Sequence, residues 1–140
     1  MSAEYFIDTN VFIYAFSPVD PAKQSRASRV IRDGLVSNRG VISGQVIQEF
    51  LHAALHKPST HVPQQLIDDY VETVLNPLCK VYASPALFIK ALQIHKETQY
   101  RFYDSLIVAA ALESGAPVLY SEDLQHGRTI GHLQIVNPFI

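Results

Sequence analysis

Apolar and polar positions alternate in blocks along this chain of 140 residues. Short runs rich in β-branched and aromatic residues, each ended by polar or turn-forming residues, predict strands. Between them lie longer segments with apolar residues three and four positions apart, which predict amphipathic helices. The predicted strands cover residues 4–7, 41–43, 80–82, 117–120 and 133–136, and the predicted helices cover residues 20–34, 44–55, 64–75, 84–98 and 104–114.

Several of these helices carry start and stop signals. Asp20-Pro21 and Ser84-Pro85 each place a capping residue before a proline, which is favoured at the first helical position. Gly115 follows the fifth predicted helix, where a glycine commonly ends the helix, and Asn76-Pro77 is expected to stop the third one. Strands separated by helices predict an α/β fold, with a mainly parallel sheet covered by helices on both faces.

One segment departs from the two-sided helical pattern. Residues 11–16 are apolar around the whole circumference of a helix, whereas a surface helix normally keeps one polar stripe. Either this segment is buried in the core or part of it contacts another chain. The sequence leaves both alternatives open.

Composition and charge narrow the class of protein. With 48% hydrophobic and 17% charged residues, we expect one compact domain spanning residues 1–140. A net charge of −2 excludes a strongly basic nucleic-acid scaffold, so any contact with phosphates requires a local patch or a bound metal. The single cysteine, Cys79, excludes an internal disulfide and a cysteine-rich zinc site. The sequence predicts neither a signal peptide nor a membrane span, so we expect a cytoplasmic protein without membrane contact.

Four carboxylates lie at the edges of predicted apolar segments. Acids at the carboxyl ends of parallel strands project into the crevice where open α/β sheets bind their ligands. Four acids meeting there would repel one another unless divalent cations lay between them, and hard cations such as Mg²⁺ or Mn²⁺ prefer oxygen ligands. The four candidates for catalysis and metal binding are Asp8, Glu49, Asp104 and Asp123.

Each acid also has a simpler explanation on its own. Asp8 and Asp104 could cap the helices that follow them, Glu49 could face water, and Asp123 could belong to a turn. Together, at strand ends and helix starts of one predicted sheet, they favour a shared chemical function over four unrelated structural roles.

The same residues and their order resemble a PIN-domain ribonuclease, specifically a toxin of the VapC type. The matching pieces are residues 6–11, 48–50, 103–111 and 120–127. The resemblance implies a PIN-like three-layer fold around a five-stranded, mainly parallel sheet. It also implies a Mg²⁺- or Mn²⁺-dependent endoribonuclease, the toxin of a toxin–antitoxin module, with an RNA substrate, a small antitoxin partner and frequent homodimers.

Carried over by position, Asp8, Glu49, Asp104 and Asp123 match the acidic residues of the family, and Ser121 matches its supporting hydroxyl position. No histidine or lysine stands in an obvious position for a general base, so we assign the nucleophile to water on the metal. Two polar side chains, Asn10 and Ser121, are expected to orient water or metal ligands without binding the metal themselves. Glu122 adds an acid beside Asp123, and the sequence does not decide which of the two faces the metal.

Other polar and aromatic groups have ordinary explanations that compete with RNA contact. His52 and His56 lie one turn apart after Glu49, but the Glu-x-x-His pattern of di-iron proteins requires two such motifs. Basic residues recur every three positions from residue 23 to residue 32, as is typical of a solvated helix face, and the aromatic residues of segment 100–103 are typical of packing. Contact with the RNA backbone or stacking on its bases is the alternative in each case.

Rival functions come from other classes of protein. A phosphatase of the haloacid-dehalogenase type requires a second Asp two residues after the first, where this chain has Asn10. A receiver domain requires paired acids at the first strand and a phosphoacceptor Asp mid-chain, and neither pattern occurs. A catalytically inert PIN-like RNA-binding module is the non-enzymatic alternative, which the presence of all four acids disfavours. The sequence does not identify the RNA target, the antitoxin or the number of metal ions.

Overall fold

A computed structural model describes residues 3–140 of the chain. Its sheet has the strand order β3-β2-β1-β4-β6-β5. The strands are β1 (Tyr5–Ile7), β2 (Gly40–Ser43), β3 (Cys79–Val81), β4 (Val118–Tyr120), β5 (Thr129–Ile130) and β6 (Leu133–Val136). All neighbouring pairs are parallel except β5 with β6. The predicted α/β fold with a mainly parallel sheet is confirmed, and the expected five strands are joined by β5, a two-residue strand at the edge.

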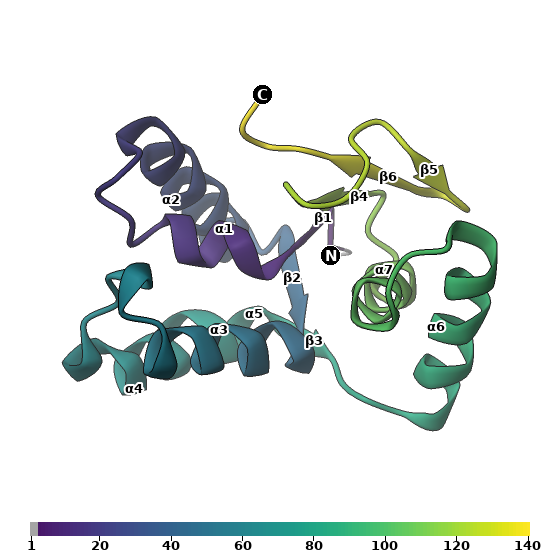
Figure 1. The fold of residues 1–140 in the computed structure, drawn as a ribbon, viewed down its shortest axis with the longest axis horizontal. Coiled ribbons are helices and arrows are strands. Elements are labelled where there is room, and N and C mark those ends of the chain that lie inside the picture. Colours follow the sequence, from purple (N-terminus) through teal and green to yellow (C-terminus); the bar gives the residue numbers. More distant parts are fainter. Residues whose placement is uncertain (1–2) are drawn as a thin grey trace.

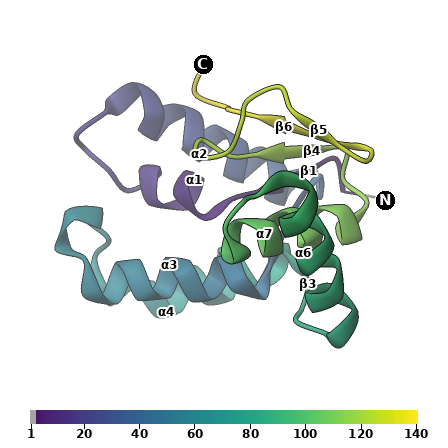
Figure 2. The same cartoon turned by 45° about the vertical axis from the view of Figure 1, so that its right-hand side comes forward.

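Helices cover both sides of this sheet. In Figure 1, α2 lies to the left of β1 and β2 and α7 lies to their right, and Figure 2 shows the same arrangement from a turned view. The main helices are α1 (Thr9–Tyr14), α2 (Pro21–Val36), α3 (Gly44–His56), α6 (Pro85–Thr98) and α7 (Phe102–Ser114). Every residue of α7 from Ser105 to Ala111 is buried, as expected for a helix that is apolar on all sides. No helix among residues 3–140 is long and apolar enough to cross a membrane.

The predicted caps are present in the structure. The carboxylate of Asp20 accepts a hydrogen bond from Lys23 N at 3.1 Å, and the hydroxyl of Ser84 accepts one from Leu87 N at 3.1 Å. Gly115 ends α7 with φ +80°, in the left-handed region that glycine adopts at little cost. These local signals therefore place α2, α6 and α7 correctly.

The predicted stop at Asn76-Pro77 is wrong. Helical backbone continues through η1 (Pro58–Thr60), η2 (Gln64–Leu66), α4 (Ile67–Tyr70), the π-helical turn η3 (Val71–Leu75) and α5 (Asn76–Leu78), with a short break before η2. Leu75 and Asn76 keep right-handed helical angles, so the helix runs through Pro77 and ends at Leu78. Pro77 follows the π-helical turn, where Asn76 N–H already bonds to Val71 O, five residues back, in place of the regular pattern that a proline interrupts.

Two residues of the apolar segment 11–16 lie in the core, and the other four are partly buried and pack against it. Val11 and Phe12 are fully buried. The ring of Phe16 packs against the rings of Phe50 and Tyr70, with centroids 6.0 and 5.0 Å away. Core burial, one of the two alternatives, therefore accounts for these side chains.

Candidate active site

Strands β1 and β4 bring residues that are far apart in the chain together where the two strands end. They are parallel, with Ile7 paired to Tyr120, so the residues that follow them lie side by side. Asp8 follows β1, its N–H donates to Tyr120 O at 3.0 Å, and its carboxylate accepts a hydrogen bond from the Ser121 hydroxyl at 2.8 Å. This hydrogen bond places the Ser121 hydroxyl directly beside Asp8.

Both carboxylate oxygens of Asp8 accept hydrogen bonds. Its second carboxylate oxygen accepts a hydrogen bond from Thr9 N at 2.7 Å, so it also caps α1. Burial raises the pKa of Asp8 to about 6; the hydrogen bonds from Ser121 and Thr9 oppose the rise, and the negative charges of Glu49 and Asp123 add to it. The carboxylate is thus held in a place that disfavours its charge.

Glu49 is held by α1 as well as by its own helix, α3. The Thr9 hydroxyl donates to one carboxylate oxygen of Glu49 at 2.6 Å, and Gln45 Nε2 donates to the other at 3.1 Å. The same Gln45 amide donates to Tyr103 O at 3.0 Å, which ties α3 to the start of α7. The sequence analysis did not identify Thr9 or Gln45 as site residues, although Thr9 lies between two residues that it did identify, Asp8 and Asn10.

Asp104 lies in the first turn of α7, and Arg101 occupies the N-cap position. The simpler explanation of Asp104 as a helix cap is therefore wrong. Burial raises its pKa, the charges of Asp123 and Glu49 raise it further, and Arg101 lowers it. No hydrogen bond within residues 3–140 uses its carboxylate, so this side chain is free to bind a ligand.

Glu122 and Asp123 point to different partners. Asn10 Nδ2 donates to Asp123 at 2.5 Å, and Asp123 lines the same cavity as the other three acids. Glu122 instead accepts hydrogen bonds from the Tyr14 hydroxyl and from Lys23 Nζ, both at 2.5 Å. Burial alone would raise the pKa of Glu122, but these two donors and the Lys23 charge outweigh it and lower the pKa. Of the two neighbours, Asp123 is the one placed among the other acids.

The four predicted acids line one cavity of about 860 Å³. They come from four separate places in the fold: the ends of β1 and β4, the middle of α3 and the first turn of α7. The remaining lining residues are mostly polar and include Gln48 and His52 of α3 and Lys57, the residue after that helix. Of these, His52 was considered from the sequence and Lys57 was not, because a lysine after a helix carries no signal of its own.

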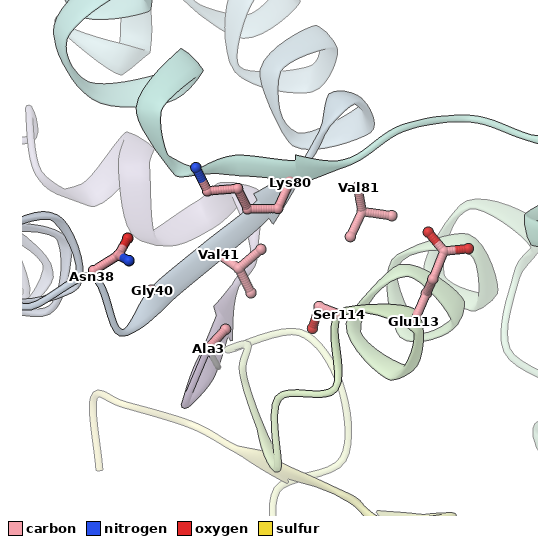
Figure 3. Close-up of a pocket in the computed structure, with 8 residues that line it drawn as sticks. All are labelled: Ala3, Asn38, Gly40, Val41, Lys80, Val81, Glu113 and Ser114. Atoms are coloured by element: carbon pink, nitrogen blue, oxygen red, sulfur yellow. The ribbon is translucent and has the colours of Figure 1, made fainter. Parts of the chain in front are cut away.

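A second cavity, of about 330 Å³, lies at the opposite edge, where the strands begin (Figure 3). Its wall is formed partly by Ala3, Gly40 and Val41, and its two charged side chains, Lys80 and Glu113, extend away from each other. This arrangement has no cluster of groups that could carry out chemistry. The acid-lined cavity is therefore the candidate active site.

The donor set of that cavity fits a hard divalent cation. Within residues 3–140, no three His, Cys, Asp or Glu side chains are placed closely enough to hold a metal ion as they stand. All four acids nevertheless face one space with oxygen donors, and their mutual repulsion contributes to the raised pKa values of Asp8 and Asp104. A cation among them would remove that repulsion, and Mg²⁺ or Mn²⁺ is the class that prefers such ligands.

Comparisons with known proteins identify a family and a fold for this chain. The PIN domain family matches residues 5–130 of the chain. No curated protein sequence is significantly similar to it. Among solved structures, the VapBC2 proteins of Rickettsia felis, bound to a DNA fragment from their promoter, include a chain with a TM-score of 0.63 and 15% identity, covering 94% of this chain and 96% of that one.

Two further structures are similar in fold. VapC20 of Mycobacterium tuberculosis, described as a sarcin-ricin loop cleaving toxin, has a TM-score of 0.59 and 19% identity, covering 86% of this chain and 90% of its own. FitAcB of Neisseria gonorrhoeae has a TM-score of 0.59 and 17% identity, covering 96% of this chain and 98% of its own. At these identities the likeness concerns the fold.

Proposed function

Because the chain belongs to the PIN domain family over residues 5–130, we propose that it is a metal-dependent endoribonuclease, folded as one domain. We further propose that it is the toxin of a toxin–antitoxin pair. The observation that carries the first proposal is the cavity that Asp8, Glu49, Asp104 and Asp123 line together. The second is supported by the similarity of its fold to VapC20, VapBC2 and FitAcB.

In this proposal the four acids would hold Mg²⁺ or Mn²⁺. A bound cation of this kind activates water and stabilises the negative charge that develops on the leaving oxygen. Without a cation, four carboxylates would repel the anionic phosphodiester. The remaining side chains keep the acids in position: Ser121 and Thr9 donate to Asp8 and Glu49, and Asn10 donates to Asp123.

Glu122 has a different role in this proposal. Its ion pair with Lys23, at 2.5 Å, joins the turn that carries Asp123 to helix α2. The Tyr14 hydroxyl joins the same carboxylate to α1. Glu122 therefore positions Asp123 and does not itself bind the metal.

The test is metal-dependent cleavage of single-stranded RNA by the purified protein, with Mg²⁺ and after exhaustive chelation. Asp104→Asn is the sharpest variant, because the Asp104 carboxylate takes part in no hydrogen bond that the change would break. We expect it to abolish cleavage while leaving the melting temperature near that of the wild type. The matched control is Asp68→Asn, since Asp68 is exposed on α4 outside the cavity.

Three outcomes would contradict the proposal. Cleavage that survives chelation would exclude the metal. RNA binding without cleavage in the wild type would favour the inert PIN-like module. Hydrolysis of a small phosphomonoester with no action on RNA would favour a phosphatase.

The partners are tested separately. We propose a homodimer and a small antitoxin with a basic tail that reaches the acidic cavity and inhibits cleavage. Three exposed apolar side chains of α6, Phe88, Ile89 and Leu92, support a protein-contacting surface outside the cavity. A strictly monomeric species in light scattering at micromolar concentration would argue against the dimer.

A further inference from the structure

The acid-lined cavity extends well beyond the acids. Helix α3 continues past Glu49 along its wall, which also includes His52, Lys57 and Ser59. At a rise of 1.5 Å per residue, His52 lies about one turn from Glu49 and Lys57 about 12 Å from it along the helix axis. In Figure 1 this part of α3 runs below α1, away from α7 and toward the short helices that follow.

The charge of the cavity is divided between its two ends. The acids occupy the end beside β1, β4 and α7, whereas His52 and Lys57 are the only basic side chains in its described lining. The ion pairs found within residues 3–140 are Lys23 with Glu122 and Arg39 with Glu4, so neither His52 nor Lys57 is neutralised by a carboxylate of the described chain. Both are exposed and therefore accessible to an anion.

The backbone that carries Lys57 is firmly held. Lys57 N donates to Ala53 O at 2.9 Å, and Lys57 O accepts hydrogen bonds from both the N–H and the hydroxyl of Thr60, at 3.1 and 2.9 Å. Gln64 Nε2 donates to Ala54 O at 2.9 Å and ties the following segment to the same helix end. An ordered backbone with an unpaired ammonium group can bind a phosphate without an ordering cost for the loop.

A lysine after a helix also interacts favourably with the helix dipole, independently of any ligand. That effect explains a positive charge at the end of α3 but does not require the end to line a cavity. Lys96 offers the comparison, because it lies in the last turn of α6 and outside the cavity. A helix-dipole role predicts the same behaviour for both lysines.

We infer that His52 and Lys57 form a phosphate-binding subsite for the RNA backbone. The inference rests on the proposed function and adds the path that the RNA strand takes across the protein. The phosphate to be cleaved lies at the acids, and a different phosphate of the same strand lies against Lys57, so the strand follows α3. The exposed ring of Tyr103, at the opposite rim beside Asp104, is available to stack on a base, which favours a nucleic acid over a phosphorylated protein as the ligand.

The subsite is tested by RNA binding in a protein that does not cleave. In the Asp104→Asn protein with Mg²⁺, we would measure the affinity for a fluorescent, unpaired single-stranded RNA by anisotropy between about 50 and 200 mM salt. Each phosphate contact to a single strand contributes about 0.7 to the slope of log affinity against log salt. Lys57→Gln should lower the slope by about that amount and weaken binding about fivefold in 0.1 M salt.

Three further variants complete the test. Lys57→Arg should restore the slope, because it restores the charge, and His52→Gln should weaken binding without lowering the melting temperature. Lys96→Gln should bind like the parent protein. Unchanged affinity and slope in Lys57→Gln, an equal loss in Lys96→Gln, or no RNA binding by the parent would each overturn the subsite.

The result is separable from the proposed function. If the wild type binds RNA through Lys57 but does not cleave it, the subsite stands and the nuclease proposal fails. If the wild type cleaves RNA and Lys57→Gln cleaves it with unchanged KM and salt dependence, the nuclease proposal stands and the subsite fails.

Discussion

Replacing Asp8 by Asn should stabilise the metal-free protein near neutral pH. Burial, with smaller contributions from Glu49 and Asp123, raises the pKa of the Asp8 carboxyl from 3.8 to about 6 in the folded state. The folded protein therefore binds this proton more tightly than the unfolded chain does. The corresponding stability is fully present below about pH 4 and is lost as the pH rises through about 6.

The size of this loss follows from the same values. One pKa unit corresponds to about 1.4 kcal/mol, so ionising Asp8 costs the folded state at most about 3 kcal/mol above pH 6. Part of the side chain remains open to the cavity, where water screens its charge, so we expect a gain of about 1 to 3 kcal/mol on its removal. For a chain of this length each kcal/mol shifts Tm by about 3 to 4 °C, which predicts a rise of about 3 to 12 °C.

Asparagine can keep both hydrogen bonds of Asp8. Its Oδ1 can accept from Thr9 N as the carboxylate does, and its Nδ2 can donate to Ser121 Oγ, because a hydroxyl both donates and accepts. The substitution therefore changes charge and little else. This equivalence makes the stability difference a measure of the buried charge.

The assay is thermal unfolding followed by circular dichroism in EDTA, at pH 7.5 and at pH 4. Asp8→Asn should melt above the wild type at pH 7.5, and the difference should shrink toward pH 4. Asp33→Asn, on an exposed position of α2, is the matched control and should stay within about 0.5 kcal/mol of the wild type. A variant that melts lower than the wild type at both pH values would refute the argument and recast Asp8 as a structural residue.

Three further predictions follow from burial, charge and donor chemistry. Phe12→Ala should lower the free energy of unfolding by about 3 to 5 kcal/mol in urea titrations, because Phe12 is fully buried, and a loss below about 1 kcal/mol would place it outside the core. Lys23→Met should lower Tm at pH 7, and this loss should shrink as the pH falls through the lowered pKa of Glu122, because the pair is lost as that carboxylate takes up a proton; a loss that does not change with pH would show that packing dominates. Zn²⁺ should support cleavage poorly compared with Mn²⁺, since Zn²⁺ sites favour His and Cys ligands, and equal rates with the two metals would contradict the all-oxygen site.

The parts of the fold that the sequence predicts are those decided by neighbours in the chain. The caps at Asp20 and Ser84 and the glycine after α7 act within a few residues, and each is confirmed. The π-helical turn η3 was missed because it gives no distinct periodicity, and the effect of Pro77 depends on that turn. Strand β5 was also missed, because two residues are too short to show the alternating pattern of a strand.

The site likewise has features that the sequence predicts and features that it does not. The pattern located the four acids, but the choice between Glu122 and Asp123 depends on Lys23, which lies 99 positions from Glu122 in the chain. The close packing of α2 on β2 also could not be predicted from the sequence, because it depends on the close approach of Gly34 and Gly40. A Cβ on Gly40 would lie 2.9 Å from Gly34 Cα. Contacts between distant positions are set by the whole fold, and no local pattern carries them.

The order of the strands determines when this site can exist. The central strand β1 acquires its neighbour β4 only after most of the chain has been made, and the hydrogen bonds from Ser121 to Asp8 and from Asn10 to Asp123 each span 113 residues. A nascent chain still on the ribosome, with β4 inside the exit tunnel, has Asp8 and Glu49 but not Asp123 or the hydroxyl that holds Asp8. A reaction that needs all four acids therefore cannot begin before β4 has joined β1, and a product that ends before β4 lacks the site.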